Sequence, residues 1–105
     1  MSVVHVHTMQ EFEEAIASST LTICDAFATW CGPCVMMTPV LEELAANNAG
    51  SVNFIKIDVD VEQDIAARLN VNAMPTFKFF KNGQQVDELV GADPEELMMR
   101  MAENM

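Results

Sequence analysis

Two of the three cysteines lie three positions apart, in the segment TWCGPC at residues 29–34. Only Gly32 and Pro33 separate Cys31 from Cys34, so both sulfurs fall within about one helical turn. A pair with this spacing can serve as a redox-active dithiol, as half of a metal site or as a structural disulfide. Which use applies decides most of what the protein does.

The composition argues against the metal and structural uses. A structural zinc site needs four ligands, and the other candidates are Cys24, His5 and His7, none of them in a second paired motif. We therefore expect no metal. A structural disulfide would close a loop of only four residues, which removes little chain entropy. The sequence favours redox chemistry.

Length and hydropathy predict one globular domain. The chain has 105 residues, enough for a single hydrophobic core, and we expect that domain to span residues 1–105. No apolar run reaches the roughly 18 residues of a membrane span, and the first residues have no export or transit pattern. We expect no membrane partner.

The charge balance and the cysteine count restrict partners and compartment. Sixteen acidic and five scattered basic side chains give a net charge of −11, which argues against a nucleic-acid partner. The acidity favours solubility and could also steer partners that dock with a basic face. An odd number of cysteines is not typical of a secreted disulfide scaffold, so we expect a cytoplasmic protein.

Local patterns predict an alternation of strands and helices. Thr8 and Glu11 have the T-x-x-E spacing of a capping box, Asn82-Gly83 is typical of a type I′ hairpin, and Asp93 precedes Pro94 as a helix cap would. Asp60 is expected to cap a further short helix. The predicted strands cover residues 3–6, 21–27, 51–59, 76–80 and 84–90, and the longest helix runs from Pro33 to about Asn48 with a bend at Pro39.

This order, βαβαβα followed by ββα, belongs to the α/β class. We expect a mixed central sheet of about five strands flanked by four helices. Cys31 then follows a central strand and begins a helix, where amide groups and the helix dipole favour a thiolate and should lower its pKa. Cys31 would attack a disulfide to form a mixed disulfide, and Cys34 would attack Cys31 and release the reduced target.

Two charged residues interrupt apolar strands. Asp25 lies within LTICDAF and Lys56 within NFIKIDV. Burial should raise the pKa of Asp25, and a nearby cation would lower it again. We expect Lys56 to be that partner.

Together these motifs resemble the thioredoxin family. WCGPC follows a strand that carries Asp25 six residues before Cys31, MPT comes about forty residues later, and KNGQ forms the hairpin. The resemblance covers nearly the whole chain without insertions. It implies the thioredoxin fold and a protein-disulfide reductase that maintains redox homeostasis as an electron carrier. The resemblance further implies that an NADPH-fed thioredoxin reductase re-reduces the protein. A monomer without a tightly bound cofactor is also implied.

The resemblance also implies roles for single residues. Asp25 would lie beneath the cysteine pair and assist proton removal from Cys34, with Lys56 tuning it. Met74-Pro75 would contain a cis peptide bond, and the Met74 backbone would pair with an extended substrate segment. The implied docking surface consists of Trp30, Gly32, Pro33, Met74, Pro75 and Gly91.

One departure from the family pattern and two alternative functions stay open. Val35 stands where many members carry Lys or Arg, which removes a positive charge beside Cys31. The same fold could serve a disulfide isomerase or oxidase, although Gly-Pro between the cysteines speaks against it. It could also serve a non-catalytic chaperone or processivity module that uses the site as a docking face.

Overall fold

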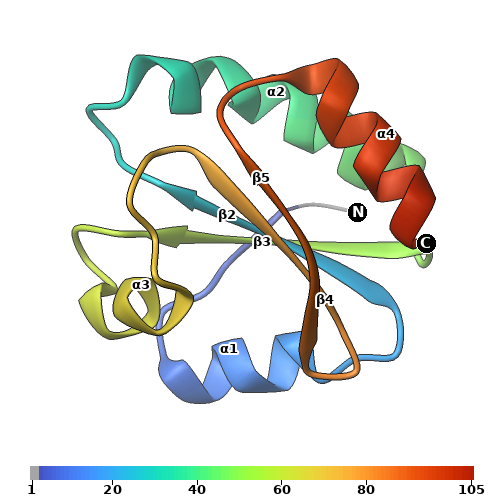
Figure 1. The fold of residues 1–105 in the computed structure, drawn as a ribbon, viewed down its shortest axis with the longest axis horizontal. Coiled ribbons are helices and arrows are strands. Elements are labelled where there is room, and N and C mark those ends of the chain that lie inside the picture. The colour runs from blue at the N-terminus through green and yellow to red at the C-terminus, as the bar shows by residue number, and fades with distance from the viewer. Residues whose placement is uncertain (1–2) are drawn as a thin grey trace.

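A computed structural model describes residues 3–105 as one mixed sheet between two layers of helices (Figure 1). The five strands are ordered β1-β3-β2-β4-β5. The strands are β1 (Val4–His5), β2 (Leu21–Phe27), β3 (Val52–Asp58), β4 (Thr76–Lys81) and β5 (Gln84–Val90), and the helices are α1 (Met9–Ile16), α2 (Gly32–Asn47), α3 (Gln63–Leu69) and α4 (Pro94–Asn104). The predicted fold class is confirmed.

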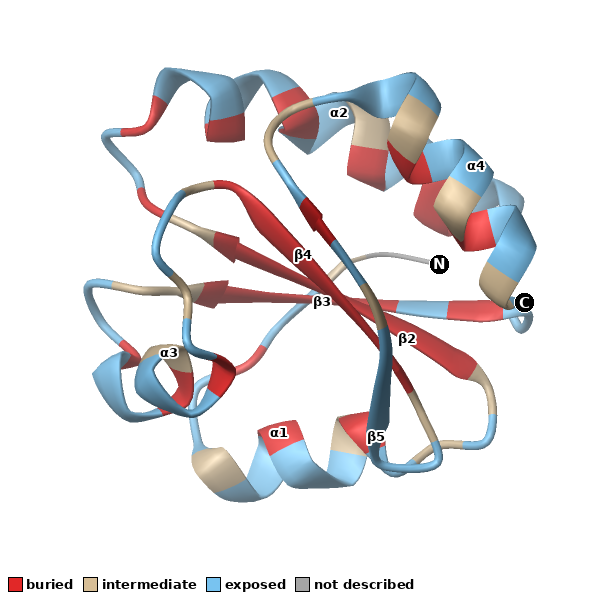
Figure 2. Ribbon diagram, in the orientation of Figure 1, coloured by how far each residue is buried: buried red, intermediate tan, exposed pale blue. Residues whose placement is uncertain are grey.

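The sheet is parallel on one side and antiparallel on the other. β1, β3 and β2 run parallel because helices connect them, whereas β4 runs antiparallel to both β2 and β5. Helices α2 and α4 cover one face and α1 and α3 cover the other (Figure 1). Strands β2 and β4 are almost wholly buried, while β5 is mostly exposed (Figure 2).

Each face of the sheet carries its own hydrophobic core. Side chains of β2 and β4 such as Ile23 and Phe77 pack with Leu41 of α2 and Leu97 of α4. Those on the other face pack with α1 and α3. Because side chains alternate along a strand, Asp25 shares the face of Ile23, beneath α2.

Local sequence signals formed the expected structures. The capping box of Thr8 and Glu11 opens α1. Asn82 and Gly83 both have positive φ, at 54° and 80°, as a type I′ turn requires. The Asp93 side chain accepts the Glu96 N–H at the start of α4.

Several element boundaries differ from the prediction, most of them by one residue. The first strand covers only Val4–His5, because its ladder to β3 involves only Ile55 and Lys56. The predicted Asp60 cap is wrong. Helix α3 begins at Gln63 with Glu62 at the N-cap position and no side-chain cap, and the Glu62 carboxylate instead contacts His7 Nδ1 at 3.1 Å.

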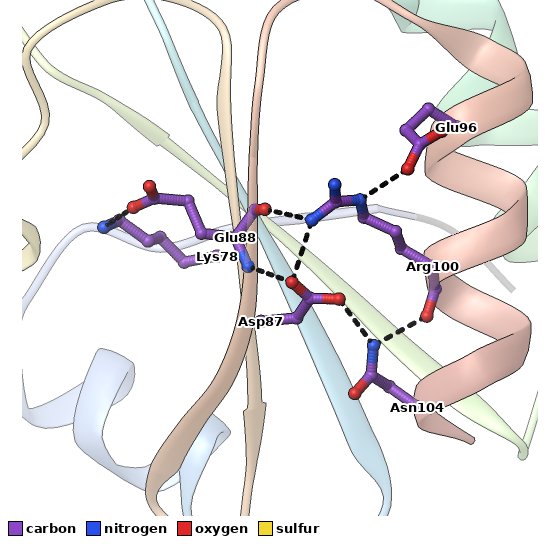
Figure 3. Close-up of polar contacts among 6 residues, drawn as sticks. All are labelled: Lys78, Asp87, Glu88, Glu96, Arg100 and Asn104. Atoms are coloured by element: carbon purple, nitrogen blue, oxygen red, sulfur yellow. Dashed lines mark hydrogen bonds and ion pairs between the residues drawn. The ribbon is translucent and has the colours of Figure 1, made fainter.

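Polar contacts hold α4 against β5 (Figure 3). Arg100 donates to Glu96 at 2.8 Å, to Asp87 at 3.0 Å and to the Glu88 carbonyl at 2.8 Å. Asn104 donates to Asp87 at 2.9 Å. Partial burial acts to raise the pKa of Asp87, but the hydrogen bonds from the Glu88 N–H, Asn104 and Arg100 outweigh it and lower that pKa. The network fixes the last helix on the edge strand.

Candidate active site

Cys31 and Cys34 form a disulfide at the N-terminus of α2. Cys31 is the N-cap residue, and its sulfur accepts the Cys34 N–H at 3.2 Å. The helix therefore presents an amide donor and the positive end of its dipole to Cys31 Sγ, as its position in the sequence predicted. Pro33 occupies the first turn, where a missing N–H costs nothing.

The disulfide lies in a small apolar cluster at the carboxyl end of β2. Cys31 is 6% exposed and Cys34 is 3% exposed. Ala28 is buried with them, and Phe27 and Met74 pack against the cluster. Cys31 is thus the slightly more exposed residue of two nearly buried ones, which suits an attacking thiol that meets its target at the surface.

The loop before β4 reaches the cysteines. The Met74-Pro75 peptide bond is cis, as predicted, and Cys31 Sγ lies 3.7 Å from the Met74 carbonyl oxygen. Gly91, at a φ of 109°, donates its N–H to the Pro75 carbonyl at 2.9 Å. Three of the predicted docking residues are therefore brought together from two loops.

Trp30 is the most prominent apolar side chain near the disulfide. It is 70% exposed, and its indole N–H donates to the Asp60 carboxylate at 2.8 Å. Asp60 therefore serves the Trp30 indole, while Glu62 occupies the N-cap of α3. Val35, Met36 and Val61 are also exposed, so the surface around the site is apolar. Met36, Val61 and the role of Asp60 were not predicted, because the sequence marks them only as apolar or acidic residues in predicted loops and helix starts.

Asp25 is buried without a hydrogen bond. It lies in β2 and is 1% exposed, and neither carboxylate oxygen has a partner among the described residues. Burial raises the pKa of Asp25 to about 7, and the charge of Lys56 opposes that rise. An unpartnered carboxyl with this pKa can gain or lose a proton near neutral pH.

Lys56 is the neighbour of Asp25 but not its ion-pair partner. The two residues are paired in register across β2 and β3, and Lys56 is 8% exposed. No ion pair joins them among the described residues. The Lys56 ammonium instead lies 4.6 Å from the centre of the Phe27 ring. The charge of Lys56 therefore lowers the pKa of Asp25 from a distance, without a direct ion pair.

A cavity of about 190 Å³ lies beside these groups, and Cys34 and Lys56 both line it. Its remaining walls come from Phe27, Ala28, Thr29, Val35 and Thr38. The cavity therefore lies between Cys34 and the buried lysine. The direct approach of Asp25 to Cys34 stays a prediction.

The third cysteine takes no part in the site. Cys24 is fully buried on the opposite face of β2, and burial together with the negative charge of Asp25 raises its pKa far above the ordinary range. Lys78, its neighbour across the ladder, is paired with Glu88. A thiol in this environment is inert.

Residues 3–105 contain no group of three or more His, Cys, Asp or Glu side chains placed to hold a metal ion. Over the same part of the chain, no helix is both long and apolar enough to cross a bilayer.

A cysteine pair at a strand-to-helix junction, with a titratable carboxyl in the adjoining strand, defines the class of thiol–disulfide oxidoreductases. Comparison with known proteins agrees. The family model described as Thioredoxin matches residues 3–103. Thioredoxin-1 of Saccharomyces cerevisiae is 42% identical over 97 residues, which cover 92% of this chain and 93% of the yeast protein.

Solved structures extend this agreement to the fold. A thioredoxin from Malassezia sympodialis has a TM-score of 0.92 at 42% identity, over 97% of this chain and 90% of that one. A thioredoxin from Fasciola hepatica has a TM-score of 0.93 at 36% identity, over 98% of this chain and all of the other. The chain belongs to the thioredoxin family, whose members are protein-disulfide reductases.

Proposed function

We propose that the protein reduces disulfides of other proteins with Cys31 as the nucleophile and Cys34 as the resolving cysteine. The Cys31 thiolate attacks one sulfur of the target disulfide, and the other target sulfur leaves and takes up a proton. Cys34 then gives up its proton and attacks Cys31, which releases the second target sulfur as a thiol after protonation. Two electrons pass to the target, and the Cys31–Cys34 disulfide remains. The observation that carries the proposal is the Cys31 sulfur at the N-cap of α2, where it accepts the Cys34 N–H.

Asp25 is the proposed proton acceptor for Cys34. A carboxyl with a pKa of about 7 is divided between its two protonation states near neutral pH, so it can both take and return a proton in each cycle. Lys56 tunes Asp25 through its charge. The cavity that Lys56 and Cys34 share gives room for a bridging water.

The proposed docking surface surrounds Cys31. Trp30 and the turn at Gly32 and Pro33 form one side, and Met74-Pro75 with Gly91 form the other. Within residues 3–105, no hydrogen bond uses the Met74 N–H. An extended target segment could therefore pair with it, as in strand addition.

The dithiol needs no metal or tightly bound cofactor in this scheme, because it carries both electrons itself. An NADPH-dependent thioredoxin reductase would reduce it again. We further propose that the protein acts as a monomeric electron carrier in the cytoplasm and maintains the redox state of disulfide-containing proteins there. Membership of the thioredoxin family supports these proposals.

Reduction of a protein disulfide coupled to NADPH through a general thioredoxin reductase tests the proposal. We expect turnover by the wild type and by Cys24→Ser, and none by Cys31→Ser. Cys34→Ser should accumulate a mixed disulfide through Cys31, visible by intact-mass measurement. Turnover by Cys31→Ser, or trapping through another cysteine, would overturn the assignment.

A further inference from the structure

Lys56 has two possible partners on one face of the sheet. Asp25 is its register partner across β2 and β3, and Phe27 lies two residues further along β2. Because side chains alternate along a strand, Asp25 and Phe27 point to the same side. The Lys56 ammonium can therefore approach the carboxylate directly opposite or the aromatic ring diagonal to it.

In the structure the Lys56 ammonium lies over the Phe27 ring. Its distance to the ring centre is 4.6 Å, within the range of a cation–π contact. Both oxygens of the buried Asp25 are left without a hydrogen bond. Burial of a carboxyl without a hydrogen bond costs free energy, and a neighbouring ammonium would ordinarily pair with it. Another contact must therefore hold the Lys56 ammonium away from Asp25.

The Phe27 ring is itself held in place. His5 of β1 contacts it edge-on, with ring centres 6.0 Å apart and planes at 84°. On another side the ring packs against the cluster of Ala28, Cys31 and Cys34. The Phe27 ring is therefore held from two sides, whereas the Lys56 side chain has several rotatable bonds and can adopt other rotamers.

We propose that Phe27 is a positioning residue that holds the Lys56 ammonium over its ring and so prevents a direct ion pair with Asp25. The proposal rests on the proton-acceptor role of Asp25 given above. A direct ion pair would stabilise the carboxylate and make it a weaker base. The aromatic ring stabilises the buried Lys56 ammonium, but it holds the ammonium too far from Asp25 for a direct ion pair with the carboxylate. Phe27 thus sets the basicity of a residue that it does not need to touch.

The charged and titratable groups around Asp25 come from every neighbouring element. Lys56 faces it from β3, Cys34 lies on α2, and His5 on β1 contacts Phe27. Cys24 is adjacent in β2 but points to the opposite face, where Lys78 of β4 also lies. The His5 ring contacts Phe27 directly, so His5 needs its own control.

The test measures the titration of Asp25 directly, by NMR of its carboxyl carbon in the oxidised protein. Phe27→Leu should lower the midpoint by about 0.5–1 pH unit when Lys56 is present, because the freed ammonium can approach the carboxylate. It should change nothing in a Lys56→Met background. Phe27→Tyr, which keeps the ring face, should keep the wild-type midpoint. His5→Gln should leave the coupling between positions 27 and 56 intact.

A second variant separates the ring's charge distribution from its shape. Pentafluorophenylalanine at position 27 has nearly the same shape but an inverted quadrupole, so it should lower the midpoint as Phe27→Leu does. An equal shift with and without Lys56, or no shift in a folded variant, would overturn the proposal. The proton-acceptor role of Asp25 is tested separately. If that role is wrong, Asp25→Ala will resolve mixed disulfides at the wild-type rate, and this result does not depend on the NMR midpoints.

Discussion

Asp25 costs the folded protein stability whenever it is ionised. Its pKa is about 7 in the folded state against 3.8 ordinarily, so the folded state holds the proton more tightly than the unfolded state does. The contribution of Asp25 to stability is therefore most favourable below pH 4, falls as the pH rises toward 7 and is level above that. The difference corresponds to roughly 4 kcal/mol.

Asp25→Ala should remove this pH dependence. We expect the variant to be more stable than the wild type at pH 8.5, by up to about 4 kcal/mol, and no more stable than it at pH 4. Urea unfolding of both oxidised proteins at the two pH values measures this. Glu43→Ala, at an exposed position of α2, is the control and should show no such gain. Equal stability differences at both pH values would contradict the assignment of a raised pKa.

Val35 leaves the start of α2 without a cation next to the nucleophile. Its side chain is exposed, and its N–H donates to the Cys31 carbonyl at 3.2 Å. Val35→Lys should increase the thiolate fraction of Cys31 in the reduced protein, because a positive charge stabilises the thiolate. We expect alkylation by iodoacetamide at pH 6 to become about twofold faster, as for an exposed charge several ångströms away.

A matched variant tests whether the effect of Val35→Lys is local. Thr38→Lys adds the same charge one turn further along α2, at an exposed position that lines the same cavity. Its effect on alkylation should be smaller. If both variants reacted at the wild-type rate, the missing cation at position 35 would not limit the reactivity of Cys31.

At the scale of the elements, α4 depends on Asp93, the N-cap residue that immediately precedes the helix. The Asp93 carboxylate accepts the Glu96 N–H at 3.1 Å and satisfies a donor that the helix itself leaves free. Asp93→Ala should lower the free energy of unfolding by about 1 kcal/mol. Glu95→Ala, in the same turn but without a capping role, should cost only a few tenths of that. Equal losses in urea unfolding would mean that charge, and not the cap, stabilises this end.

Elements with strong local signals were predictable, and those set by tertiary contacts were not. Residues 21–27 form a strand with the predicted bounds because a mainly apolar run, interrupted only by Thr22 and Asp25, must be buried. The start of α3 was mispredicted because the turn after β3 places Glu62 and not Asp60 at the N-cap, and the Asp60 carboxylate accepts the Trp30 indole N–H from 30 residues away. The same limit applies to the site. Cys31, Cys34 and cis Met74-Pro75 follow motif and family pattern, whereas the position of Lys56 over Phe27 depends on side-chain packing that no spacing encodes.

At the scale of the whole molecule, the basic side chains are all engaged. Arg68 pairs with Glu13, Lys78 with Glu88, and Arg100 with Asp87 and Glu96. Lys56 lies over Phe27, and Lys81 donates to the Asn104 carbonyl. Many exposed carboxylates therefore have no cation nearby, and the net charge of −11 acts as self-repulsion in the compact state.

Salt should consequently stabilise this protein. Raising NaCl from 10 to 200 mM shortens the Debye length from about 30 Å to below 10 Å and screens the repulsion between carboxylates. We expect the urea midpoint at pH 7 to rise with salt. Glu42, Glu43 and Glu103 are exposed and belong to no ion pair among residues 3–105, so replacing all three by Gln should raise the midpoint at low salt and flatten its salt dependence. A midpoint that falls with added salt would mean that the four ion pairs of Arg68, Lys78 and Arg100 stabilise the fold more than the excess charge destabilises it.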